Sequence, residues 1–132
     1  MDTLNYPPSL DADVLARCFV AHNRELGVLP RDVAAFVEAC RRDGLAVLGW
    51  ELWLVDVAQS GSWTGLIPCK GDDRPSVVSG SIDGEPVGEW THYVGRSAEE
   101  AIAQIARFSL DTVADEYAES IRYNFAFTRG GR

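Results

Sequence analysis

Two side chains in this sequence, Glu51 and His92, have surroundings that suit acid–base chemistry. Glu51 interrupts the apolar run 45–57, LAVLGWELWLVDV, and a carboxylate enclosed by apolar residues is a frequent general acid or base. His92 alternates with aromatic residues in the run 90–93, WTHY. One hypothesis is therefore a small-molecule-binding or catalytic domain with a pocket between sheet and helix. Its aromatic lining would be Trp50, Trp53, Trp63, Trp90 and Tyr123.

The sequence contains no motif typical of a metal or cofactor site. Its two histidines are not in HExxH or HxH spacing, and its three cysteines form no CxxC pair. The glycines form neither a phosphate-binding loop nor a nucleophile elbow. We expect no metal and no cofactor, and the odd number of cysteines favours a reducing cytoplasm over a disulfide-bonded protein.

Acidic residues are concentrated in one part of the chain. The net charge is −8, and the span from Asp72 to Glu119 holds 11 acids against three arginines, while the rest is balanced. This distribution disfavours nucleic acid and favours a basic protein partner. The second hypothesis is a non-enzymatic binding protein with Trp90 or Tyr93 as its aromatic anchor. The candidate acidic contacts are Asp72, Asp73, Asp83, Glu85, Glu89, Asp115, Glu116 and Glu119.

A third hypothesis is a homodimer joined along an exposed sheet edge. No apolar run approaches the roughly 20 residues needed to span a bilayer, so we expect no membrane association. The N-terminus begins with acids and lacks the basic and apolar regions of a signal peptide, which again favours the cytoplasm.

The run 45–57 is apolar at both odd and even positions, which predicts a central strand covered on both faces. Two helices should precede it. The first would begin at the N-cap Ser9, continue to Leu26 and stop at Gly27. The second would start at Pro30, with Asp32 in its first turn, and end before Gly44.

Beyond the central strand, residues 63–69 should pair back as a hairpin strand. Strands 76–82 and 85–94 should flank the turn Asp83-Gly84, with a disordered loop over 71–88 as the alternative. Ser97 and Glu100 form a capping box, so a helix should run from Ala98 to about Tyr117. Alternation over 121–128 then predicts a final strand.

These elements predict a single α+β domain spanning residues 1–132. We expect a mainly antiparallel sheet of about four to five strands packed against two to three helices, with residues 1–8 as an N-terminal arm and 129–132 as a frayed tail. The C-terminal half of the last predicted helix carries Asp111, Asp115, Glu116 and Glu119, where acids oppose the helix dipole. Such acids suit either a solvated face or a cationic partner.

The segments 29–36 (LPRDVAAF), 44–55 (GLAVLGWELWLV) and 90–94 (WTHYV) together resemble the small immunity proteins of bacterial polymorphic toxin systems, in particular immunity protein 40. The resemblance covers about half of the chain and consists mostly of core pattern. It implies a cytoplasmic, non-enzymatic protein that binds and neutralises a cognate toxin, and it supplies no catalytic residue.

Overall fold

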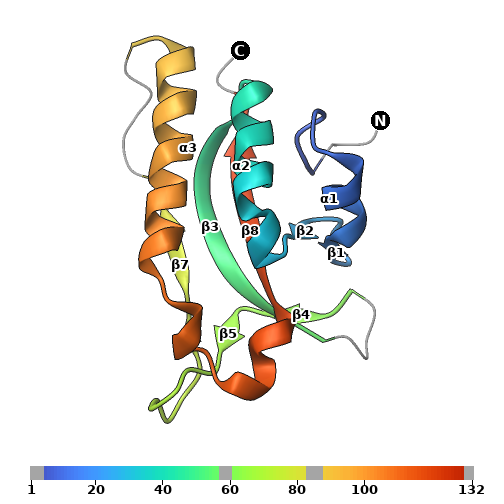
Figure 1. The fold of residues 1–132 in the computed structure, drawn as a ribbon, viewed down its shortest axis with the longest axis vertical. Coiled ribbons are helices and arrows are strands. Elements are labelled where there is room, and N and C mark those ends of the chain that lie inside the picture. Colours follow the sequence, from blue (N-terminus) through green and yellow to red (C-terminus); the bar gives the residue numbers. More distant parts are fainter. Residues whose placement is uncertain (1–4, 57–60, 83–87, 130–132) are drawn as a thin grey trace.

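The strand β3 (Ala46–Val55) lies at the centre of the fold, as its sequence predicts. In the computed structural model, which describes residues 5–56, 61–82 and 88–129, β3 pairs antiparallel along its length with β8 (Ile121–Thr128). Its other edge pairs with β7 (Ser79–Ser81) near the middle of β3 and with β4 (Trp63–Thr64) at its C-terminal end (Figure 1). The single α+β domain with an antiparallel sheet is confirmed.

The two faces of β3 have different neighbours. A register shift between Val47 and Gly49 marks a bulge, after which Trp50 and Leu52 join the core on the helix side. Trp53 and Val55 belong to a separate, smaller cluster on the opposite face. The strand is therefore buried on both sides, but by unequal layers.

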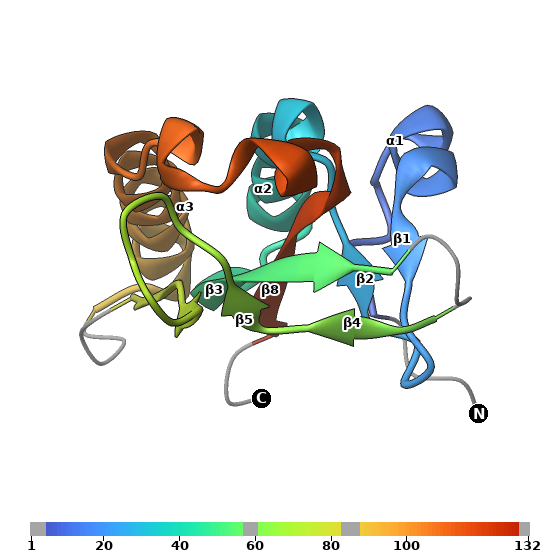
Figure 2. The same cartoon turned by 90° about the horizontal axis from the view of Figure 1, so that it is seen from below.

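The helices α2 (Val33–Arg42) and α3 (Trp90–Arg107) cover the main core on one side of the sheet (Figure 2). The start and end of α2 follow the prediction. The 3-10 turn η1 (Pro30–Asp32) precedes α2, and Gly44 follows it with φ +73°, the left-handed conformation that glycine adopts without steric cost. Phe36 of α2 stacks on Phe125 of β8 with ring centroids 5.1 Å apart.

The predicted start of the third helix is wrong. Residues 90–94 belong to α3 and not to a strand, and Ser97 lies fully buried inside the helix. Its hydroxyl donates to the Val94 carbonyl at 2.9 Å and accepts the Val47 N–H at 3.1 Å, so Ser97 joins helix to sheet where we predicted an N-cap. Alternation over 90–93 is too short to distinguish a strand from a helix whose buried stripe begins at Tyr93.

The predicted helix from Ser9 to Leu26 is also wrong. The helix α1 (Ala12–Arg17) is capped by Asp11, and a short hairpin of β1 (Phe19–Val20) and β2 (Leu26–Gly27) follows. Asn23 favours the turn because its side chain accepts the Glu25 N–H. In the predicted arm, Pro7 is buried, so the described part of residues 1–8 is not a free surface segment.

The last predicted helix ends early. After α3 stops at Arg107, the chain forms two 3-10 turns, η2 (Leu110–Thr112) and η3 (Asp115–Ser120), so the acids of this segment do not oppose an α-helix dipole.

The segment 66–77 forms a small ribbon of β5 (Leu66–Ile67) and β6 (Ser76–Val77). The turn Asp83-Gly84 and residues 130–132 of the predicted tail lie outside the described residues. Across the described ranges, no helix has the length and apolar character needed to cross a bilayer.

Candidate functional site

Two segments far apart in sequence are joined at one end of the domain, beyond β5 and α3. The Lys70 N–H donates to the Thr112 carbonyl at 2.7 Å, and the Ala114 N–H donates to the Pro68 carbonyl at 2.9 Å. The Lys70 ammonium also pairs with the Asp115 carboxylate at 2.9 Å. These contacts hold the loop that carries Asp72 and Asp73 against the 3-10 turns.

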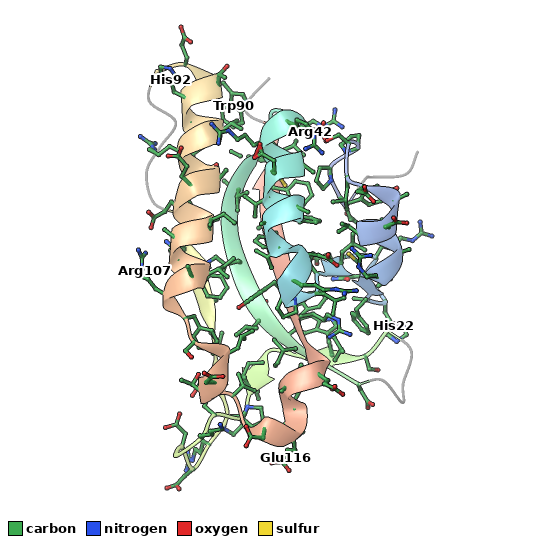
Figure 3. All side chains as sticks on the ribbon, in the orientation of Figure 1. His22, Arg42, Trp90, His92, Arg107 and Glu116 are labelled. Atoms are coloured by element: carbon green, nitrogen blue, oxygen red, sulfur yellow. The ribbon has the colours of Figure 1, made fainter. Side chains whose placement is uncertain are left out.

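The result is a group of exposed carboxylates, which we call the acidic end. Lys70 and Arg74 are the bases in the same two segments, and one of them already pairs with Asp115. Figure 3 labels one member, Glu116, at the lower end of the molecule. The acidic end comprises Asp72, Asp73, Asp111, Asp115, Glu116 and Glu119.

The remaining predicted contacts do not lie there. Glu89 directly precedes α3, whose first turn with Trp90 and His92 is at the opposite end of the molecule from Glu116 (Figure 3). Trp90 donates its indole N–H to the Gly44 carbonyl at 2.8 Å, and Tyr93 is buried in a cluster with Ala46. Neither ring is therefore available as the predicted anchor beside the acids. Asp83 and Glu85 lie outside the described residues.

The predicted aromatic pocket between sheet and helix does not assemble. Trp50 and Tyr123 are on the helix side, with ring centroids 5.8 Å apart, and the Trp50 indole donates to the Gln104 side chain at 2.9 Å. Trp53 and Trp63 stack on the other side of the sheet, and His92 is exposed at the far end of α3. The proposed lining is divided because neighbouring positions of a strand point to opposite faces.

Three of these residues come together on the face of the sheet that α2 and α3 do not cover, which we call the open side. The rings of Trp53 and Trp63 lie 4.0 Å apart and nearly parallel, and the half-buried Glu51 carboxylate accepts the Trp53 indole N–H at 3.4 Å. Trp53 is almost completely buried, whereas Trp63 remains 37% exposed. The buried ring thus holds the exposed one in place.

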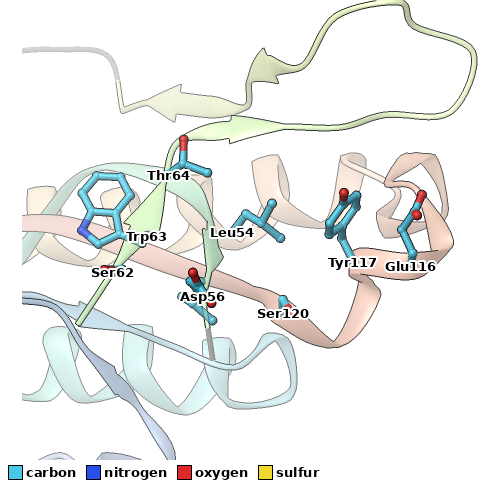
Figure 4. A pocket seen from close by; sticks show the side chains of 9 residues that line it. Leu54, Asp56, Ser62, Trp63, Thr64, Glu116, Tyr117 and Ser120 are labelled. Carbon is cyan, nitrogen blue, oxygen red and sulfur yellow. The ribbon is translucent and has the colours of Figure 1, made fainter. Parts of the chain in front are cut away.

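A pocket with a volume of about 530 Å³ connects Trp63 to the acidic end. In Figure 4, Trp63 and Tyr117 lie on opposite sides of the pocket with Leu54 between them. The site therefore combines one residue of the predicted aromatic pocket with one of the predicted acidic contacts, Glu116. The full lining is Leu54, Val55, Asp56, Ser62, Trp63, Thr64, Glu116, Tyr117 and Ser120.

Apolar side chains are exposed in the same region. Tyr117 is 37% exposed, and the paired residues Leu66 and Val77 of the β5–β6 ribbon are 51% and 59% exposed. Sequence reasoning missed these residues and Asp56. Tyr117 directly follows the predicted contact Glu116, but we interpreted it only as the end of the helix that begins at Ala98.

Three groups with raised pKa values lie outside the lining of this pocket. Burial raises the pKa of Tyr123 to about 12, that of Cys40 to about 12 and that of Cys18 to about 11, so both thiols stay protonated at neutral pH. Among the described residues, no group of three or more His, Cys, Asp and Glu side chains is arranged to hold a metal ion. The site offers binding chemistry through carboxylates, hydroxyls and aromatic rings.

Comparisons with family models, curated proteins and solved structures give no significant match. The case for a function therefore depends on the residues of the site and their arrangement.

Proposed function

We propose that this chain is a non-enzymatic binding protein whose acidic end engages a basic protein. Together with the sequence resemblance, this suggests a cytoplasmic immunity protein that neutralises a cognate basic toxin domain. The observation that carries the proposal is that exposed carboxylates and exposed aromatic and aliphatic side chains occupy the same end of the domain.

The two kinds of side chain have complementary roles in association. Carboxylates on one surface attract a positively charged partner, which raises the rate of encounter and orients it. Aromatic side chains near the centre of an interface supply most of the binding free energy when they become buried. Trp63 is well suited to this because its stacking on Trp53 already restricts its rotamers, so little further entropy is lost on binding.

The catalytic alternative receives less support. Glu51 accepts a hydrogen bond from the Trp53 indole on the open side of the sheet, whereas His92 lies at the first turn of α3. A general acid and base must both reach one substrate, and the pocket that His92 lines with Arg41 and Arg96 does not include Glu51. The homodimer hypothesis stays a prediction.

The first test is a rescue experiment in the native host's gene neighbourhood. Neighbouring toxin domains would be expressed in a sensitive bacterium with the wild-type chain or with the charge-reversed variant Glu116→Lys/Glu119→Lys. We expect wild type to restore growth and the variant to lose rescue, because the reversed charges repel a basic partner. Co-purification should weaken between low salt and about 0.5 M salt, at which screening shortens to a few Å.

A matched control carries the same change of charge elsewhere. Glu38 and Glu99 are exposed on α2 and α3, outside the acidic end, so Glu38→Lys/Glu99→Lys should still rescue growth. Equal loss in both variants would mean that only net charge matters. Rescue by both variants would contradict the proposal. Failure of the wild-type chain itself to rescue growth would also contradict it.

A further inference from the structure

The pocket beside the acidic end has three chemical features. Its lining includes the partly exposed aromatic residues Trp63 and Tyr117 and the aliphatic residue Leu54 (Figure 4). The carboxylates of Asp56 and Glu116 contribute negative charge at its border, and both residues are exposed. None of the described residues that line it is a lysine or an arginine.

This combination matches a long side chain with an apolar stem and a cationic head. Leu54 and the ring surfaces cover methylene groups, while the faces of Trp and Tyr rings attract a cation lying over them. Nearby carboxylates add charge-assisted hydrogen bonds. A purely apolar ligand would desolvate the carboxylates without compensation, and an anionic ligand would be repelled.

Arginine fits this site better than lysine. Its planar guanidinium stacks on aromatic faces and still donates hydrogen bonds in its own plane, whereas the compact ammonium of lysine is more strongly hydrated. One face of the Trp63 ring is covered by Trp53, so the indole is fixed as a flat platform. The hydroxyl of Ser120 at the lining offers a further acceptor.

We propose that this pocket takes an arginine side chain of the basic partner and forms the anchor point of the interface. The inference rests on the proposed function, because it assumes that the acidic end binds a protein. It adds the identity of the central contact and the residues that recognise it.

The direct test uses capped arginine, N-acetyl-arginine amide, titrated into the full chain and followed by NMR. The probe should shift the indole N–H resonance of Trp63, assigned with a Trp63→Phe variant, in a saturable way with an affinity on the order of millimolar. The neutral isostere N-acetyl-citrulline amide should bind about tenfold more weakly or worse, because it lacks the charge. Equal shifts with both probes, or none with either, would overturn the proposal.

Variants then locate the site. We expect Tyr117→Ala and Glu116→Gln each to weaken the arginine probe by roughly three- to tenfold, whereas Glu99→Gln on α3 leaves it unchanged. Tyr117→Phe keeps the ring and should retain most of the affinity, which separates loss of stacking from a folding defect. Unchanged binding in Tyr117→Ala would place the probe elsewhere and overturn the assignment.

The rescue assay distinguishes this inference from the proposed function. If Glu116→Lys/Glu119→Lys abolishes rescue but Tyr117→Ala does not, the acidic end binds the toxin without the arginine anchor and only the present inference fails. If neither variant affects rescue, both fail. Loss of rescue in Tyr117→Ala with a wild-type urea midpoint supports both.

Discussion

The helix side and the open side of the sheet use the same kinds of residue for different purposes. Trp50, on the helix side, is 7% exposed, packs on Tyr123 and donates its N–H to Gln104. Trp63, on the open side, has one stacked neighbour and is 37% exposed. Folding has thus buried one indole almost completely and left another partly exposed, where a partner is able to cover it.

Polar groups differ in the same way between the two regions. On the helix side, the Ser97 hydroxyl and the Trp90 indole make hydrogen bonds that join a helix to β3 or to the chain just before it. At the acidic end, the carboxylates are exposed, and Asp115 pairs with Lys70 across the surface. Exposed ion pairs of this kind contribute little to stability, so these acids add little to the stability of the fold.

The largest expected effect separates the two tryptophans. Trp50→Ala should lower the free energy of unfolding by about 3–5 kcal/mol, because it leaves a cavity in the main core. Trp63→Ala should lower it by about 1 kcal/mol, mainly through the lost ring stacking, while abolishing growth rescue. Urea unfolding followed by circular dichroism measures both. Similar losses of stability would show that the two sides are not energetically distinct.

A smaller contrast concerns two glycines on opposite sides of the sheet. A Cβ at Gly80 would overlap the Trp50 ring and the Gln104 side chain, so Gly80→Ala should cost about 1–3 kcal/mol. A Cβ at Gly65 would meet the Glu51 carboxylate, the free end of a flexible side chain on the open side, and should cost less than about 1 kcal/mol. Thermal unfolding of the two variants compares them, and a larger loss for Gly65→Ala would reverse the comparison.

The smallest effect contrasts a paired carboxylate with a solvated one. Arg17 donates two hydrogen bonds to Asp32, at 2.9 and 3.0 Å, and these bonds lower the pKa of Asp32. A lowered pKa gives stability that is present above the unfolded-state value of about 3.9 and is lost as the pH falls through the folded-state value.

The urea midpoint of Asp32→Asn should therefore lie below that of wild type at pH 6, and the gap should close in more acidic solution. Glu116→Gln, at the acidic end, serves as the control and should change the midpoint little at pH 6. A gap that stays constant with pH would show that the Arg17–Asp32 pair does not depend on ionisation.

The sequence alone determined the elements whose pattern is long or well bounded. The 10-residue β3, the helix α2 with its glycine stop and the alternating β8 all follow from hydrophobic periodicity and capping. It also located the excess of acids, since charge is a property of composition. Short or ambiguous patterns failed, as at residues 9–26 and around Ser97, because tertiary contacts there outweigh local preference.

Only the tertiary structure decided which side chains meet. The register of the β3–β4 pair placed Trp63 opposite Val55, and contacts of the 68–70 segment with residues 112–115 brought the two acidic stretches together. A register shift after Val47 allows Val47 and Trp50, three positions apart, both to join the main core. Local patterns record the periodicity of one element, whereas a site between Trp63 and Tyr117 depends on how distant elements pack.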